Sequence, residues 1–108
     1  MSLKHAEFDT TSAIAFGSLT TSDQVVATLS NDVDQLFLLN STNSLVIVVA
    51  PQLVSGVVVY RDFFRLPANT FLAYDGRANK KTICKGEIRA RYSGTAPTSG
   101  EFSVTGLR

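Results

Sequence analysis

The sequence predicts an all-β protein: an antiparallel β-sandwich or jelly roll of about seven to eight strands, with an extended N-terminal arm. Runs of about six to eleven residues rich in Val, Ile, Leu, Phe, Tyr and Thr alternate with short segments of Gly, Pro, Asn, Asp and Ser, which is the rhythm of sandwiches and barrels. No stretch keeps apolar residues at helical spacing, so we expect little or no helix. A chain of 108 residues is long enough for one hydrophobic core and too short for two.

The chain divides into a polar arm, residues 1–15, and a single sandwich domain, residues 16–108. Acidic residues precede any apolar run in the arm, which is not the pattern of a secretion signal. No apolar run approaches the roughly 20 residues that a membrane-spanning helix needs, so we expect no membrane partner. A polar arm of this kind can become ordered on a neighbouring subunit.

The middle of the chain predicts a hairpin and two strands that are apolar on both faces. In residues 37–48, "FLLNSTNSLVIV", Asn40 and Asn43 suit positive φ in a short connection. Residues 45–49 and 57–60 carry apolar side chains at successive positions, although only one face of a sandwich strand meets the core. Either the chain's own loops or a second subunit must cover the other face, and we favour assembly.

The second half of the chain continues with a turn, a short strand and a half-exposed strand. Residues 67–69, "PAN", predict a tight turn before a strand that ends at "DG", and residues 76–81 read as an exposed basic connection. Residues 87–92 alternate cleanly between apolar and charged side chains, which predicts one face in the core and one in water. Residues 94–100 link this strand to the last one, and Pro97 keeps the loop out of both ladders.

The alternation also predicts the core. For residues 45–49 the parity stays open, because a shift of one residue exchanges the two faces of the strand. The candidate core residues are Val25, Leu29, Leu36, Leu38, Val46, Val48, Ile88, Ala90 and Tyr92.

The charge of the chain is unevenly distributed, although its net value is only +1. Residues 1–60 carry one basic and five acidic residues, whereas residues 61–91 carry eight basic and three acidic ones. We expect the two segments to lie on different parts of the surface, so that one end of the molecule is basic. Such an end would steer association with an acidic partner.

Nothing in the sequence predicts catalysis. The single histidine, His5, lies in the arm, and there is no G-x-S-x-G elbow for a nucleophilic serine. Cys84 stands beside Lys85, which could lower the thiol pKa, but a cysteine within a strand is more typical of a small core residue. His5, Glu7 and Asp9 alternate and could share a metal with a partner chain, but all three lie in the arm. We therefore expect no enzyme activity, no metal and no cofactor.

Nucleic-acid binding and carbohydrate binding are the two alternatives to a structural role. The basic residues between 77 and 91, with three tyrosines, could bind nucleic acid, but the protein is nearly neutral and Tyr92 shares the face of core residues, so we expect no nucleic-acid partner. A carbohydrate-binding β-sandwich is the other alternative. It would use exposed aromatic side chains, and the available ones are Tyr60, Phe63, Phe64 and Tyr74.

Four short stretches carry a resemblance to a known group of proteins. They are "FGSLT" at 16–20, "VVATL" at 25–29, "LLNST" at 38–42 and "SGTAPTSG" at 93–100. Together they resemble small structural proteins of tailed bacteriophages and prophages. The resemblance implies a non-enzymatic β-sandwich or jelly-roll component of the virion, assembled in the bacterial host cytoplasm. A capsid decoration, or cement, protein is favoured over a tail, neck or fibre-associated protein.

The expected partners follow from this reading. We expect a homo-oligomer, a dimer or trimer, that binds a larger virion protein such as the major capsid protein. The apolar strands would supply most of the affinity, and the basic residues of the 76–81 connection would meet acidic groups of the shell. The candidate interface residues are Phe8, Leu45, Ile47, Val49, Val58, Tyr60, Arg77, Lys80 and Lys81.

Overall fold

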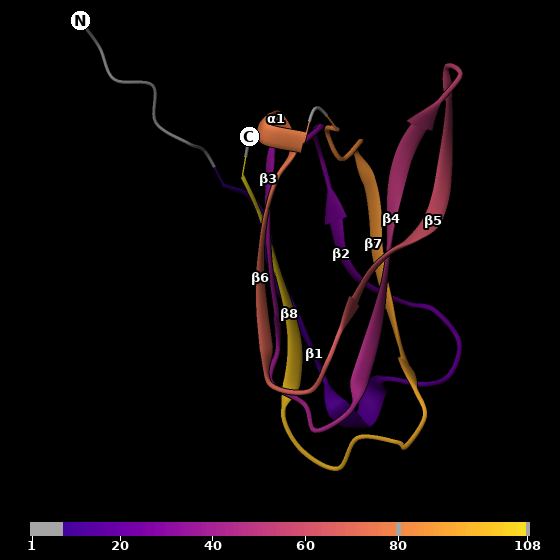
Figure 1. Cartoon of the computed structure of the whole chain (residues 1–108), viewed down its shortest axis with the longest axis vertical. Coiled ribbons are helices and arrows are strands. Elements are labelled where there is room, and N and C mark those ends of the chain that lie inside the picture. Colours follow the sequence, from indigo (N-terminus) through magenta and orange to yellow (C-terminus); the bar gives the residue numbers. More distant parts are fainter. Residues whose placement is uncertain (1–7, 80, 108) are drawn as a thin grey trace, which may run out of the picture.

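The computed structural model describes residues 8–79 and 81–107 and places them in two four-stranded antiparallel sheets packed face to face (Figure 1). The predicted all-β sandwich is therefore confirmed, and the only helical segments among these residues are the single turns η1 (Phe16–Ser18) and α1 (Gly76–Asn79). The strands are β1 (Phe8–Ala15), β2 (Gln24–Leu29), β3 (Gln35–Asn40), β4 (Leu45–Val54), β5 (Val57–Leu66), β6 (Thr70–Asp75), β7 (Gly86–Ser93) and β8 (Glu101–Leu107).

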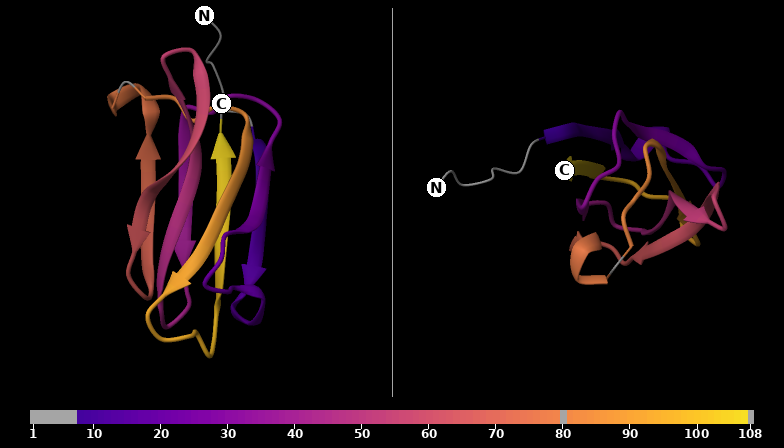
Figure 2. Two further views of the ribbon diagram at one scale, coloured as in Figure 1. Left: turned by 90° about the vertical axis from the view of Figure 1, so that its right-hand side faces the viewer. Right: turned by 90° about the horizontal axis from the view of Figure 1, so that it is seen from above.

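The strand order is that of a jelly roll. The first sheet runs β1-β8-β3-β6 and the second sheet runs β2-β7-β4-β5. The pairs β1·β8, β2·β7, β3·β6 and β4·β5 nest inside one another along the sequence, so the chain resembles one long hairpin rolled into two layers. Figure 2 shows the layers from the side and from above, with the yellow β8 of the first sheet behind the second sheet in the left view.

The connection between β3 and β4 differs from the predicted hairpin, because these strands lie in different sheets. Neither Asn40 nor Asn43 has positive φ; among the described residues other than glycine, only Ser55 (φ 50°) and Asn69 (φ 54°) do. Ser55 and Gly56 (φ 80°) form the tight turn of the β4–β5 hairpin, in which both central residues need positive φ. The hairpin prediction for residues 37–48 was therefore wrong.

Asn40 is instead a buried link between two connections that cross from sheet to sheet. Its Nδ2 donates to the carbonyl oxygens of Ser44 (2.8 Å), Leu66 (3.0 Å) and Pro67 (3.0 Å). Its Oδ1 accepts hydrogen bonds from the backbone amide (3.1 Å) and the hydroxyl (2.6 Å) of Thr42. A buried amide with both ends satisfied stabilises and fixes the loops around it. The turn at residues 67–69, which the sequence predicted, leads directly into β6.

The core matches the prediction at seven of nine positions: Leu29, Leu36, Leu38, Val46, Val48, Ile88 and Ala90 are buried. Tyr92 is half-buried and packs against this core. Val25 was predicted wrongly, since half of its surface (50%) is exposed. The ladder between β2 and β7 shifts register between Val25 and Ala27, so Val26 and Ala27 are the buried residues there.

The boundary of the predicted arm also needs correction. Residues 8–15 form β1, an edge strand of the first sheet, and pair with β8 in the register Thr10↔Gly106 to Ala15↔Glu101. Ile14 packs against the core, and the backbone of β1 completes the hydrogen bonding of β8 on its outer side. Residues 1–7 of the arm lie outside the described residues.

Aromatic side chains pack between the edge strands of the two sheets, β5 and β6. Phe63 is the extra residue where β5 bulges, since Val48 pairs with Phe64 and Val49 pairs with Asp62. The rings of Phe63, Phe64 and Tyr74 meet edge to face at centroid distances of 4.3 and 5.3 Å. The Tyr74 hydroxyl donates to the Lys81 carbonyl oxygen at 2.6 Å, and burial raises the pKa of that hydroxyl.

Candidate functional site

The outer face of the second sheet contains most of the predicted interface residues, and the structure settles which way β4 faces. Val46, Val48 and Ala50 belong to the core cluster. The alternate residues therefore face outward, yet Ile47 and Val49 are only 5% and 3% exposed. Leu45, at the start of the strand, is half-buried. Side chains of this protein, from β5 and β7, cover most of the outer apolar face of β4.

The first of these covering contacts is an ion pair that crosses β4. Arg91 on β7 donates two hydrogen bonds to the carboxylate of Asp62 on β5, at 3.0 and 2.7 Å. Because β4 lies between these strands, the pair passes over its outer face, diagonally between Ile47 and Val49. Arg91 also donates to Asp23 at 2.9 Å. The hydrogen bond from Arg91 lowers the pKa of Asp62, and both carboxylates raise the pKa of Arg91.

The second covering contact joins Arg89 and Tyr60 over the same strand. The Arg89 guanidinium lies 4.0 Å from the centre of the Tyr60 ring, and it also pairs with Glu87 at 2.6 Å. The Tyr60 hydroxyl accepts a hydrogen bond from the Glu87 backbone amide at 3.1 Å, so Tyr60 also reaches across from β5 to β7. A Cβ at Gly86 would lie 2.6 Å from the Tyr60 hydroxyl, so only glycine leaves room for the hydroxyl at this position. We call these two contacts the arginine clasps.

The other predicted interface residues lie apart from the arginine clasps. Val58 is exposed near the tip of the β4–β5 hairpin, which extends beyond the rest of the sandwich in Figure 1, and Leu53 and Val57 are exposed beside it. Arg77 and Lys81 are also exposed. Lys80 and the side chain of Phe8 lie outside the described residues.

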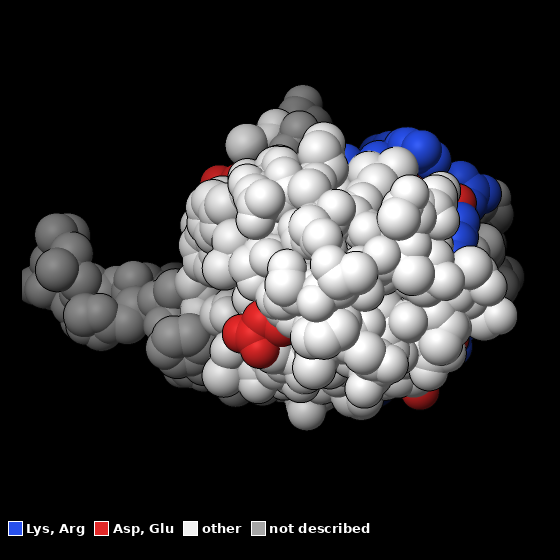
Figure 3. Space-filling view, turned by 90° about the horizontal axis from the view of Figure 1, so that it is seen from below, with Lys and Arg blue, Asp and Glu red and all other residues white. Residues whose placement is uncertain are grey.

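The predicted separation of acidic and basic segments is wrong. Arg91 pairs with Asp23 although 68 residues separate them, and Asp32 accepts a hydrogen bond from the Lys85 backbone amide at 2.8 Å. Because the jelly roll pairs early strands with late ones, the acidic first half and the basic second half lie side by side. The end formed by loops 41–44, 67–69 and 94–100 is mostly uncharged: Figure 3 shows an acidic group on this face and basic groups only at its margin.

The outer face of the first sheet has no comparable cover. Two central rows of side chains cross its four strands and contain no charged residue. In the order β1, β8, β3, β6, one row is Ala13, Ser103, Leu39, Phe71, and the other row is Thr11, Thr105, Phe37, Ala73. Leu39 is 42% exposed and Phe71 is 60% exposed. The rings of Phe37 and Phe71 stack with centroids 6.2 Å apart. We call these eight residues the first-sheet face.

The sequence reasoning missed the first-sheet face, although a signal was present. Residues 36–39 and 71–74 carry apolar side chains at successive positions, as residues 45–49 and 57–60 do. The decisive difference lies in the neighbouring strands. On β8 and β1 the outward residues of these rows are Ser, Thr and Ala, which are too short to cover a leucine or phenylalanine on β3 or β6.

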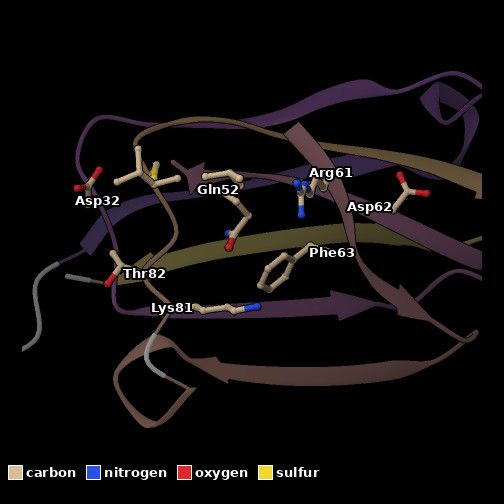
Figure 4. Close-up of a pocket in the computed structure, with 10 residues that line it drawn as sticks. Asp32, Gln52, Arg61, Asp62, Phe63, Lys81 and Thr82 are labelled. Atoms are coloured by element: carbon tan, nitrogen blue, oxygen red, sulfur yellow. The ribbon is translucent and has the colours of Figure 1, made fainter. Parts of the chain in front are cut away.

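A pocket of about 480 Å³ lies beside the ring of Phe63, under the β4–β5 hairpin. It separates the inner face of the β4–β5 hairpin from the segment 81–84, which an isolated bridge between Val33 and Ile83 holds in place. Figure 4 shows its side chains. The lining residues are Asp32, Gln52, Leu53, Val54, Arg61, Asp62, Phe63, Lys81, Thr82 and Cys84.

Cys84 in this pocket does not have the character of a nucleophile. Burial, followed by the charge of Asp32, raises its pKa above the ordinary value, although a backbone hydrogen bond with Leu53 acts in the opposite direction. The sequence suggested that Lys85 lowers the pKa of the Cys84 thiol. The pKa is instead raised, so that suggestion was wrong. Within residues 8–79 and 81–107, no three His, Cys, Asp or Glu side chains are grouped as a metal site would require.

Comparison with known proteins gives no relative from which to transfer a function. No protein-family model matches the chain, and no curated protein or solved structure matches it significantly. Among the described helices, none is long and apolar enough to cross a membrane.

Proposed function

We propose that this protein is a non-enzymatic structural component of a virion: a decoration protein that binds the capsid shell through the first-sheet face. The single observation that carries the proposal is the uncharged first-sheet face, on which Leu39 and Phe71 remain exposed. Contiguous exposed apolar surface of this kind marks protein interaction sites. The phage-like stretches between residues 16 and 100 support the virion setting, and the jelly roll is a fold that viral capsid proteins use.

The chemistry of the first-sheet face suits docking on a second protein. Phe37 and Phe71 offer a rigid stacked pair of rings, and aromatic side chains supply much of the energy in interface centres. The surrounding Ser, Thr and Ala side chains are small, so a partner can approach the sheet closely. The absence of charge in the two central rows means that no ion has to lose its water when the face is covered.

The size of the face favours binding as an oligomer. Four strands about 4.8 Å apart and about six residues long cover on the order of 400 Å². A stable interface buries about 800 Å² on each partner, so one face alone predicts weak binding. A homo-oligomer, a dimer or trimer as the sequence suggested, would engage several shell sites at once and bind more tightly without new contacts. The exposed Leu53, Val57 and Val58 at the hairpin tip are the proposed contacts between copies.

The test is binding of the purified protein to particles that lack it. Phe71→Ser should reduce occupancy by at least about tenfold, because it removes an exposed ring from the centre of the proposed interface. Val25→Ser is the matched control, since Val25 is similarly exposed on the outer face of the second sheet. Equal occupancy for both variants would refute docking through the first-sheet face.

The copy number in purified particles separates the two virion roles. A copy number comparable with that of the shell protein supports decoration of the capsid. A few copies per particle would instead support the alternative that the sequence left open, a tail, neck or fibre-associated protein.

A further inference from the structure

The pocket beside the β4–β5 hairpin is independent of the first-sheet face and arises from the length of the hairpin. The pairing of β4 with β7 ends at Val49↔Arg89, whereas its pairing with β5 continues to Val54↔Val57. Beyond Ala50 the inner face of the hairpin therefore points toward the segment 81–84 rather than into the core. Arg61, which pairs with the inward-facing Ala50, projects from this inner face.

Arg61 and Lys81 are the basic residues that line the pocket, and Asp32 and Asp62 line it as well. Figure 4 shows the guanidinium of Arg61 and the ammonium of Lys81 directed into the space around the Phe63 ring, from opposite walls. Among the described residues, neither Arg61 nor Lys81 forms an ion pair. Asp62, the nearest acid in sequence, points away in the same view and is held by Arg91. Both cations are therefore available to an anionic group that enters the pocket.

The other walls of the pocket present hydrogen-bond acceptors and an aromatic ring. Gln52 is only 9% exposed, its Nε2 donates to the Pro51 carbonyl oxygen at 3.1 Å, and Figure 4 shows its side-chain amide extending into the pocket, where Oε1 can accept a hydrogen bond. One oxygen of Asp32 accepts from the Lys85 backbone amide, and the other can accept from a ligand. The ring of Phe63 is fixed by Phe64 and Tyr74 and presents an apolar wall.

We infer that this pocket binds an acidic sugar, a hexuronic acid unit. Its carboxylate would lie between Arg61 and Lys81, its hydroxyls would donate to Gln52 and Asp32, and its C–H face would pack on Phe63. A glutamate or aspartate side chain has the carboxylate but no hydroxyls for the two acceptors. The volume is in the range of small-ligand sites.

The inference goes beyond the proposed function and does not depend on it. An acidic sugar could bind to the free protein, and the pocket shares no residue with the first-sheet face. Leu53 lines the pocket and is also one of the proposed contacts between copies. The glucuronate titration needs neither the shell nor the oligomer, so each proposal can fail while the other stands.

The test is an NMR titration of the isotope-labelled full chain with glucuronate at constant ionic strength. We expect saturable shifts of the backbone amides of Leu53, Val54, Thr82 and Cys84. Glucose, which lacks the carboxylate, should bind at least about tenfold more weakly, because hydrogen bonds to charged groups contribute roughly 1.5–3 kcal/mol. Acetate and a glutamate tripeptide, which lack the ring hydroxyls, should also bind more weakly.

Variants locate the site. Arg61→Met and Lys81→Met should each weaken glucuronate binding by about tenfold or more while the remaining amide spectrum is retained. Arg65→Met is the matched control, since Arg65 lies on the same strand but pairs with the outward-facing Ile47. Equal losses for Arg65→Met would show diffuse charge attraction and overturn the inference. If the glutamate tripeptide binds as tightly as glucuronate, the ligand is a protein. If the shifts do not saturate, there is no site. Either result also overturns the inference.

One further outcome concerns the role of Arg61 in solubility. An inward-pointing charge on an edge strand also prevents edge-to-edge aggregation. If Arg61→Met causes self-association but binds glucuronate as the wild type does, Arg61 protects the edge of β5 and the proposed site is wrong.

Discussion

The two outer faces of this sandwich start from the same kind of sequence and end differently. On the second sheet, Ile47 points outward from a central strand and is 5% exposed. On the first sheet, Leu39 points outward from a central strand and is 42% exposed. Both strands are apolar on both faces, so the difference comes from their neighbours. Arg89, Arg91 and Tyr60 extend across β4, whereas the neighbours of β3 include only one long side chain, Phe71, in the central rows.

The comparison shows that a doubly apolar strand does not by itself require a partner protein. The hydrocarbon stem of an arginine covers apolar surface while its head stays in water, and an ion pair across the strand holds the stem flat. The second sheet therefore supplies its own cover, and the argument for a partner moves to the first sheet. The predictions below test this difference, in order of decreasing effect on stability.

Ile47→Asp should destabilise the protein most, although its side chain points outward. It would place a carboxylate beneath the Arg91–Asp62 pair at a buried position, at a cost of about 3–5 kcal/mol. Leu39→Asp is the matched substitution on the first sheet and should cost less than about 1 kcal/mol, since Leu39 is already exposed. Urea denaturation measures both. Similar losses for the two variants would mean that the faces do not differ in cover.

Gly86→Ala should cost about 1–3 kcal/mol. Gly86 has φ of +146°, and the new Cβ would displace the Tyr60 hydroxyl from the Glu87 amide. Gly17→Ala, where a Cβ meets nothing within 4 Å, is the control and should change stability by less than about 0.5 kcal/mol. Thermal unfolding followed by circular dichroism compares them, and equal midpoints would contradict the role of Tyr60 as a clasp.

Arg91→Met should cost about 1 kcal/mol at neutral pH, through lost pairing and cover. Because the pKa of Asp62 is lowered below its ordinary value of 3.8, the stabilisation from its pairing is complete above that value and is lost as the pH falls through the lowered pKa. The stability difference between wild type and Arg91→Met should therefore be constant from about pH 7 to 5 and shrink below about pH 4. Lys85→Met, at an exposed position, should show no such pH dependence.

Local patterns in the sequence predicted the strands well and the contacts between distant segments poorly. The alternation at residues 87–92 was sufficient to assign Ile88 and Ala90 to the core and the arginines to the surface. Asn40 could not be assigned, because its amide bonds a carbonyl 26 residues away, at Leu66. The error at Val25 came from a bulge that no residue pattern marked.

The candidate sites were harder to predict than the fold for the same reason. The Arg91–Asp62 clasp joins strands that are neighbours of β4 only once the jelly roll has formed, so Ile47 and Val49 were predicted as interface residues. The pocket brings together Asp32, Gln52 and Lys81, which no spacing in the chain relates. The apolar runs at 36–39 and 71–74 were visible, but their exposure depends on the short side chains of β1 and β8.

The last prediction transfers a clasp from one face to the other. On the second sheet, Arg91 pairs with Ile47 and reaches Asp62 opposite Val49. On the first sheet, Thr105 pairs with Phe37, and Phe71 lies opposite Leu39 on the other side of β3. Thr105→Arg combined with Phe71→Asp therefore reproduces the diagonal across a central strand.

The double variant should show a favourable coupling of only about 0.2–1 kcal/mol in a double-mutant cycle, because both new groups are partly exposed. Its effect on function should be much larger than its effect on stability, since the new pair covers Leu39 and places charge in the centre of the first-sheet face. Binding to particles should be lost while the urea midpoint stays close to that of the wild type. Retained binding would show that the first-sheet face is exposed without being an interface.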